Sequence, residues 1–172
     1  MTLKGYSRSG GRRSGGIRSV ALARADAVRA VEYDAGDDSF SEIDLLPGEK
    51  FSLYNFKEDE ASYSETLSCS GGVVSVTHEL TFMLEKMDEV SRMAVEELCE
   101  ASYDGLIAVV TTNSDVSLMV GYSRKFGAER PLKVSRSAAV TGRGPADVTG
   151  ETLSLVSTDG SKSKRFSFVL AL

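Results

Sequence analysis

Histidine chemistry in this chain depends on His78, the only histidine among 172 residues. A Ser-His-Asp or Cys-His mechanism needs an imidazole that can take up a proton, and a multi-histidine metal centre needs more than one ring. His78 lies on the apolar side of an alternating run from Val74 to Leu84. We therefore interpret His78 as a hydrogen-bonded core side chain. We predict no catalytic residue and no enzymatic activity.

The cysteines, acidic runs and glycines carry no stronger chemical signal. Cys69 and Cys99 are far apart and neither belongs to a Cys-x-x-Cys pair, so we expect buried, inert thiols and no zinc site or disulfide framework. The acids at 58–60 lack the spaced pattern of a calcium loop. The Gly-Arg-Gly at 142–144 lacks the strand, lysine and helix of a phosphate loop. The sequence predicts neither a metal nor a cofactor.

Charge is divided unevenly along the chain. The formal net charge is −5, yet the first 25 residues carry six bases and no acid. A basic, glycine- and serine-rich segment cannot bury enough apolar surface to fold alone, so residues 1–16 should form a flexible arm. Three interpretations stay open: an assembly arm lying on a neighbouring copy, a disordered tail, and a nucleic-acid contact. The predicted assembly contacts are Lys4, Arg8, Arg12, Arg13 and Arg18.

Two segments of the body are predicted to contact neighbours. An acidic segment, with an exposed turn at 34–38, is the expected partner of the arm. The segment 123–150 is an expected long loop with only a short strand-like run around 132 and 134. Long loops are uncommon in compact domains unless they serve a function or are disordered. The acidic surface comprises Glu32, Asp34, Asp37, Asp38, Glu42 and Asp44. The loop contacts are Arg124, Lys125, Phe126 and Arg143.

Hydrophobic periodicity indicates which elements position these residues. Strict alternation over 74–84 predicts a long strand with one buried face. Apolar residues at steps of three and four predict one helix over about 88–102, with acids at its start and a glycine after its end. The segment 106–110 is apolar throughout, so we expect a central strand covered by the helix on one face and by a second sheet on the other.

The other elements are predicted from weaker patterns. Short strands are expected within 17–46, although 21–30 is rich in alanine and has helical propensity as well. Further strands are expected at 51–56 and 62–69. Turn residues predict one hairpin from 106–110 to 116–122, and a second through 159–160 that closes the chain.

These elements predict one β-rich domain, residues 17–172, after the arm. The fold class is mainly β (α+β), an antiparallel β-sandwich or half-barrel with one flanking α-helix. The start of the chain lacks the apolar core of a signal peptide, and no stretch approaches the roughly 18 apolar residues of a membrane span. We therefore expect no membrane partner and synthesis in the cytoplasm.

The order of elements resembles that of the tail-tube proteins of tailed bacteriophages and related injection machines. Several segments between about 62 and 160 are also similar to small prophage structural proteins: SVTHELTF at 75–82, GLIAVV at 105–110, VGY at 120–122 and TGETLSL at 149–155. The resemblance implies a virion structural subunit that self-assembles into rings, commonly hexamers, which stack into a conduit for DNA. It brings no catalytic residue with it.

The same resemblance implies the partners and the location. The neighbours would be further copies of this chain and other tail or neck proteins, and DNA would pass without specific binding. The protein would be located in the virion, and in the host cytoplasm during assembly. An acidic body lining the bore would repel phosphates. The alternative function is a soluble β-sandwich binding or adhesion module that uses the 123–150 loop for recognition.

Overall fold

The computed structural model describes residue 5 and residues 14–167. Within this part of the chain the fold is mainly β, with two sheets and one α-helix, which confirms the predicted fold class. Four predicted arm contacts lie outside the described residues: Lys4, Arg8, Arg12 and Arg13. The fifth, Arg18, lies in the first strand with its guanidinium 2.7 Å from a carboxylate oxygen of Asp115.

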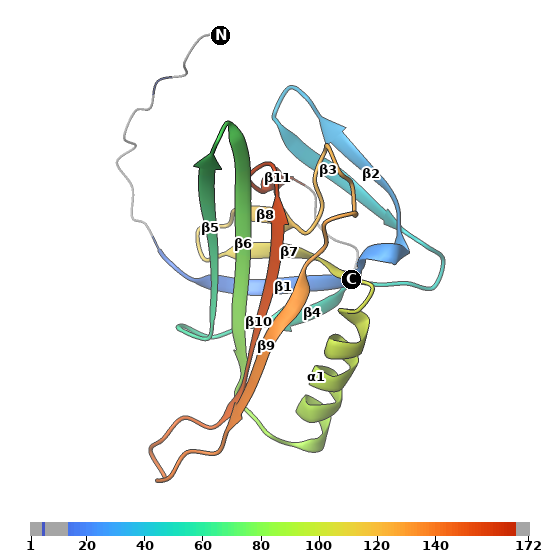
Figure 1. The fold of residues 1–172 in the computed structure, drawn as a ribbon. Helices are drawn as coiled ribbons and strands as arrows, with labels where there is room; N and C mark the ends of the chain where they lie inside the picture. The colour runs from blue at the N-terminus through green and yellow to red at the C-terminus, as the bar shows by residue number, and fades with distance from the viewer. Residues whose placement is uncertain (1–4, 6–13, 168–172) are drawn as a thin grey trace.

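The larger sheet has seven strands, in the order β2 (Val28–Asp34), β3 (Ser39–Leu45), β11 (Lys164–Phe166), β8 (Ser117–Val120), β7 (Leu106–Thr112), β1 (Ile17–Arg24) and β4 (Ser52–Asn55). The smaller sheet has four, in the order β5 (Ala61–Ser70), β6 (Val73–Leu84), β10 (Gly150–Asp159) and β9 (Lys133–Val140) (Figure 1). Paired strands are antiparallel, except that β11 runs parallel to β3. The chain also forms a 3₁₀ turn η1 (Ala25–Ala27) and the helix α1 (Glu89–Ala101).

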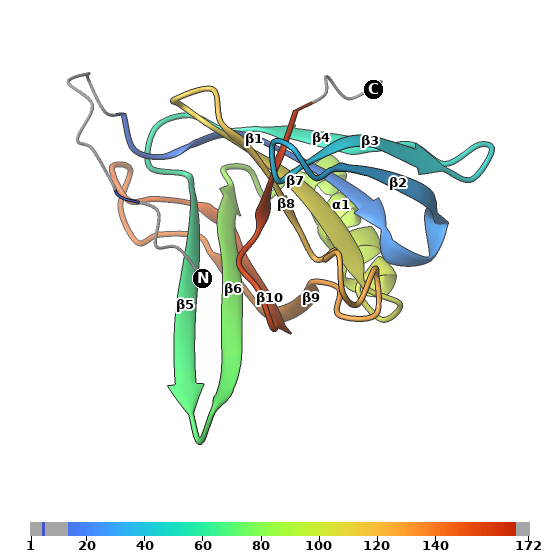
Figure 2. The same ribbon diagram turned by 90° about the horizontal axis from the view of Figure 1, so that it is seen from above.

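The two sheets and α1 share one hydrophobic core (Figures 1 and 2). β6 and β10 contribute Leu80, Phe82 and Leu153 to it, and α1 contributes Val95 and Leu98. This burial pattern confirms the strand and the helix that have the clearest periodicity. The helix begins after Asp88, as predicted.

The central strand β7 is buried on both faces, as predicted, but its two covers differ from the expectation. Leu106, Ala108 and Val110 face the core that contains both the four-stranded sheet and α1. Ile107 and Val109 face a second cluster inside the curved seven-stranded sheet. The helix and the four-stranded sheet therefore lie side by side over one face of β7. The other face of β7 is covered by residues of the curved seven-stranded sheet itself.

Two predictions about the later part of the chain are wrong. The long loop expected at 123–150 is interrupted by a full strand, because β9 extends the short strand-like run near 134 as far as Val140 and pairs with the edge of β10. The chain does not close with a hairpin through 159–160: β10 stays in the small sheet, whereas β11 joins β3 and β8 in the large one. Residues 160–163 therefore cross between the sheets. The segment 21–30 forms no α-helix despite its helical propensity. It contains the end of β1, the short turn η1 and the start of β2.

Candidate functional site

The four-stranded sheet ends in two strands, β5 and β9, whose outer edges pair with no other strand among the described residues. An unpaired edge exposes backbone N–H and C=O groups that can bind a strand of another chain. Monomeric proteins protect such edges with proline, lysine or a covering segment. β5 is ten residues long and contains neither proline nor lysine. Its edge is therefore suited to pairing with a partner.

The two edges carry opposite charge. The segment that enters β5 holds three consecutive acids at 58–60. Residues 130–143, which include β9, hold four bases and no acid, and all four bases are exposed. These bases are Arg130, Lys133, Arg136 and Arg143. Two copies placed edge to edge would bring the acidic start of β5 near the basic β9, and this attraction favours contact between unlike edges.

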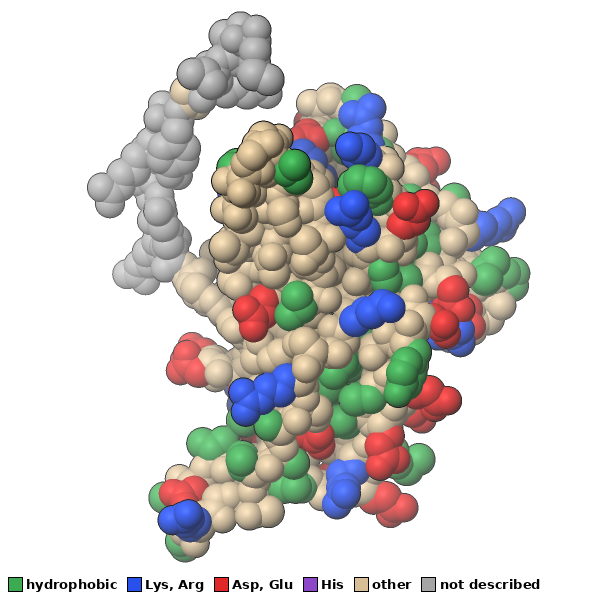
Figure 3. Space-filling view, viewed as in Figure 1, with side chains coloured by type: hydrophobic (Ala, Val, Ile, Leu, Met, Phe, Trp, Pro, Cys, Tyr) green, Lys and Arg blue, Asp and Glu red, His purple; other side chains and the backbone are tan. Residues whose placement is uncertain are grey.

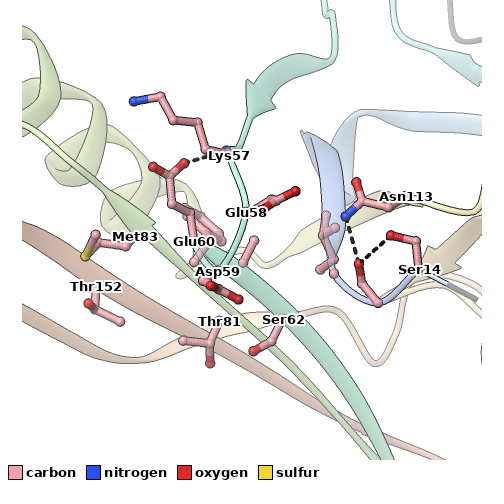
Figure 4. A pocket seen from close by; sticks show the side chains of 15 residues that line it. Ser14, Lys57, Glu58, Asp59, Glu60, Ser62, Thr81, Met83, Asn113 and Thr152 are labelled. Atoms are coloured by element: carbon pink, nitrogen blue, oxygen red, sulfur yellow. Dashed lines mark hydrogen bonds between the residues drawn. The ribbon is translucent and has the colours of Figure 1, made fainter.

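A cavity of about 670 Å³ lies beside the acidic start of β5 (Figure 4). Its opposite wall is the segment 14–16, which two side chains hold against the turn between β7 and β8. Asn113 Nδ2 donates to the Gly15 carbonyl at 2.8 Å, and Ser114 Oγ donates to the Ser14 carbonyl at 3.0 Å. The segment 14–16 is the last part of the predicted arm, so the arm joins the body beside this acidic cavity.

The predicted acidic surface lies on the hairpin of β2 and β3. Alternate residues of this hairpin pack on the second core cluster, and the acids occupy the other face. Glu32 and Glu42 are direct cross-strand partners, and like charges in that position repel. The acids that share this outer face are Glu32, Asp34, Glu42 and Asp44. Asp37 and Asp38 lie in or beside the turn, with Asp38 at φ 52°.

Three of the predicted loop contacts gather near the tip of this acidic hairpin. The guanidinium of Arg124 lies over the ring of Tyr33 at 4.6 Å, and Lys125 lies over the Phe126 ring at 5.1 Å. Tyr33 also donates a hydrogen bond to Asp38, whose carboxylate pairs with Lys164. The structure thus joins part of the predicted acidic surface to part of the predicted loop surface. Arg143 lies apart from them, in the loop between β9 and β10.

A buried polar network surrounds His78, which is 3% exposed. Its Nε2–H donates to the Ser161 carbonyl at 3.2 Å, and its Nδ1 is 2.8 Å from the Tyr63 hydroxyl. That hydroxyl donates to Glu65 Oε1 at 2.8 Å, and the backbone N–H of Ser163 donates to the same oxygen at 2.9 Å. The prediction of a hydrogen-bonded core histidine is confirmed. The network connects β5 and β6 to the crossover at 160–163.

Ionisation within the network follows from these contacts. Burial raises the pKa of Tyr63, and the neighbouring Glu65 carboxylate raises it further. Burial alone would raise the pKa of Glu65, but hydrogen bonds from Ser163 and Tyr63 outweigh it, so that this pKa lies below its ordinary value. A neutral tyrosine and a charged carboxylate therefore share the site at neutral pH. The Tyr63 hydroxyl and the Glu65 carboxylate both have hydrogen-bond partners, as a network with a structural role requires.

The remaining candidate chemistry gives a mixed result. The expectation that both thiols are buried is wrong, because Cys69 is exposed and Cys99 is only half-buried. Burial raises the pKa of the Cys99 thiol. Among the residues that the structure describes, no cluster of three His, Cys, Asp or Glu side chains could hold a metal ion. No helix in the described part of the chain is long and apolar enough to cross a membrane.

Sequence reasoning found only a short strand-like run around 132 and 134 where β9 lies, and it missed the His78 network. Valine stands only at the two ends of 134–140, which is a weak strand signal, and nothing in the sequence pairs Glu65 with Ser163. Comparison with known proteins adds no assignment: no family model matches the chain, and no curated protein sequence matches it.

Proposed function

We propose that copies of this chain assemble edge to edge into a closed ring and act as a tail-tube-like structural subunit of a phage virion. The four-stranded sheet supports this proposal, because its open edges carry opposite charge. The sheet has an even number of antiparallel strands, so β5 and β9 run in opposite directions. Pairing β9 of one copy with β5 of the next therefore extends an antiparallel sheet.

Contact between two different edges favours a ring over a symmetric dimer. The interface is heterologous, since β9 of each copy meets β5 of its neighbour. Such interfaces form a closed ring when the rotation from one copy to the next is a whole fraction of a full turn. Closure also removes every open edge of the small sheet. A hexamer is the ring size that the tail-tube resemblance implies.

The shape of the subunit determines which face of the small sheet lines the bore. One face packs against the large sheet and α1, and the other is open to solvent (Figure 2). The bulky layers fit only on the outer, longer circumference of a ring, so the open face must point inward. The side chains on this face of β5, β6 and β10, which alternate with the buried residues, are Ser62, Ser64, Thr66 and Ser68 on β5, Ser75, Thr77, Glu79 and Thr81 on β6, and Thr152, Ser154, Val156 and Thr158 on β10.

A bore rich in hydroxyl groups suits the passage of DNA without specific binding. Figure 3 shows a surface that is mostly neither apolar nor charged at the upper end of the small sheet, with acidic and basic side chains farther down. Affinity for DNA comes mainly from lysine and arginine contacts to phosphate. On this face β5, β6 and β10 carry no base and one acid, Glu79, whereas β9 adds Lys133 and Arg136, the cross-strand partners of Val156 and Ser154. The proposed bore is therefore mostly lined by hydroxyl groups, with two bases at its β9 edge, rather than acidic, in contrast to the expectation from the net charge.

The basic arm is proposed to lie on the acidic β2–β3 hairpin of a neighbouring copy. The repulsion between Glu32 and Glu42 would be relieved by a cationic partner. Lateral contact through the edges and a second contact through the arm would then hold each pair of subunits. Other tail or neck proteins are the proposed neighbours at the ends of the assembly, and no catalytic role is proposed.

Charge reversal at the edges tests this function. Light scattering and negative-stain microscopy of the full chain should show rings, and Arg136→Glu should weaken them. Each exposed ion pair contributes about 0.2–1 kcal/mol, and the loss recurs at every interface of the ring. Combining Arg136→Glu with Asp59→Lys should restore assembly, whereas Arg92→Glu on α1 serves as the control and should leave it unchanged. A protein that is monomeric at every concentration would contradict the proposal.

Deleting residues 1–13 separates the ring from the alternative binding module. The deletion leaves Ser14 and the contacts of 14–16 intact. A ring that uses the arm should lose assembly, whereas a binding module should remain a folded monomer that keeps its partner. The module has less loop for recognition than expected, because β9 occupies 133–140.

A further inference from the structure

The hairpin of β5 and β6 projects beyond the rest of the small sheet (Figure 2). β10 pairs with β6 only as far as Val76, so the residues nearer the turn lack a third strand. We call residues 67–75 the overhang. Its two-residue turn uses Gly71 and Gly72 at φ 57° and 81°, and neither has another residue's atom within 4 Å of an added Cβ. The overhang therefore stands free at one end of the subunit.

One face of the overhang continues the buried face of the sandwich without a cover. Leu67 pairs with Val76 and Cys69 pairs with Val74, in register with the core residues farther down both strands. Val76 is fully buried, but Leu67 is 48% exposed and Val74 46%. No charged residue occurs from 66 to 77. An uncharged hairpin with an exposed apolar face indicates a surface that another segment covers.

The opposite end of the same sheet carries a second exposed apolar segment. This is the β9–β10 loop, residues 141–149, which projects at the lower end of the molecule (Figure 1). Val148 is 62% exposed, and Val140, which ends β9 beside the loop, is 50% exposed. Figure 3 shows apolar atoms gathered at this lower end.

The loop is shaped by its own hydrogen bonds. Asp147 accepts from the backbone N–H groups of Arg143 and Gly144 at 2.7 and 2.8 Å, and these bonds lower its pKa. The carboxylate is therefore engaged within the loop while Val148 stays exposed. A preorganised loop loses less entropy when it binds.

We infer that the apolar face of the overhang receives the β9–β10 loop of a second copy, end to end. The inference rests on the proposed function, since this contact would join one ring to the next. The two surfaces lie at opposite ends of one sheet, so the contact is heterologous and repeats along an axis without closing. The charged edges are used within a ring, which leaves these apolar ends for contact between rings.

Disulfide cross-linking can locate this contact, because Cys69 is an exposed thiol on the overhang. In full-length chain carrying Cys99→Ser and Val148→Cys, diamide should produce a ladder of covalent multimers on a non-reducing gel. A disulfide requires Cα atoms within about 7 Å, so the ladder reports direct proximity. The matched control, Val116→Cys in the turn between β7 and β8, should give at least tenfold less product.

Other occupants of the overhang give distinct results. The last five residues of the chain, 168–172, are apolar in sequence, and Leu172→Cys tests whether they cover Cys69. Cross-linking of Cys69 to Leu172→Cys, with none to Val148→Cys, would overturn the inference. Stacked rings that form without any cross-link from Val148→Cys would overturn it as well.

A polar substitution separates this inference from the proposed function. Leu67→Lys with Val74→Lys should leave single rings intact but abolish their stacking in negative stain. Tubes as long as those of the wild type would overturn the end-to-end contact. A complete absence of rings in the wild-type protein would instead contradict the edge-to-edge assembly. Val90→Lys, at an exposed apolar position on α1, is the matched control and should leave stacking unchanged.

Discussion

Replacing Glu65 by glutamine should show how strongly the buried network holds the two sheets together. Glu65 Oε1 accepts from the Tyr63 hydroxyl at 2.8 Å and from the Ser163 backbone at 2.9 Å, and His78 Nδ1 is 3.6 Å away. Hydrogen bonds to a charged group contribute about 1.5–3 kcal/mol each, and neutral ones about 0.5–1.5 kcal/mol. Glutamine keeps the shape but not the charge. We therefore expect Glu65→Gln to lower the free energy of unfolding by about 2 kcal/mol at pH 7.

The effect of Glu65→Gln should depend on pH. The pKa of Glu65 is lower in the folded protein than its ordinary value, which is about 4.3. A lowered pKa contributes stability that is present above the unfolded-state pKa and is lost as the pH falls through the folded-state pKa. The difference between wild type and variant should therefore be largest above about pH 5 and shrink below about pH 4.

Urea unfolding followed by circular dichroism measures this difference. The titrations are run at pH 7 and pH 3, at a concentration where both proteins are monomeric. Tyr63→Phe removes the hydroxyl but leaves the carboxylate, and it should also destabilise the fold at pH 7. Equal stability of wild type and Glu65→Gln at pH 7, or a difference of the same size at both pH values, would refute the reasoning.

Three further variants test local features of the fold by thermal or denaturant unfolding. Gly150→Ala should cost about 2–3 kcal/mol, because Gly150 has φ 150° and an added Cβ would lie 2.4 Å from the Leu84 carbonyl oxygen. Asp88→Ala should cost about 1 kcal/mol, because it removes the 2.8 Å cap to the Ser91 N–H of α1. Leu98→Ala should cost about 2–5 kcal/mol, because Leu98 is buried between α1 and both sheets.

The elements that could be predicted from the sequence are those whose apolar pattern is decided by burial of one face. β6 alternates because one side faces the core, and α1 repeats at three and four residues because one stripe packs against both sheets. β7 is apolar throughout because both of its faces are covered. In each case the local pattern and the tertiary contacts agree, so the pattern alone was sufficient.

The errors arose where contacts distant in sequence decide the structure. β9 is an edge strand with little burial, so its side chains show no strict apolar alternation. Pairing with β10 makes it a strand. The crossover after β10 is held by His78 and Glu65, which lie more than 80 residues earlier. Cys69 is exposed because β5 extends past the large sheet, and no local pattern marks where that cover ends.

Part of the candidate site was predictable as charge but not as geometry. The acids at 58–60 and the bases near Arg143 are visible in the sequence, yet only the sheet order places them at opposite edges of one sheet. The acidic hairpin was anticipated as a surface. Its closeness to Arg124, through Tyr33, depends on the fold.

Hydrogen exchange of backbone amides at the two edges of the small sheet tests edge-to-edge assembly most directly. Exchange is compared between dilute monomer and the assembled protein. Amides whose N–H groups point outward from β5 and β9 should exchange rapidly in the monomer and become protected on assembly, while those of α1 should change little. Assembled protein in which neither edge gains protection would contradict the proposed interface.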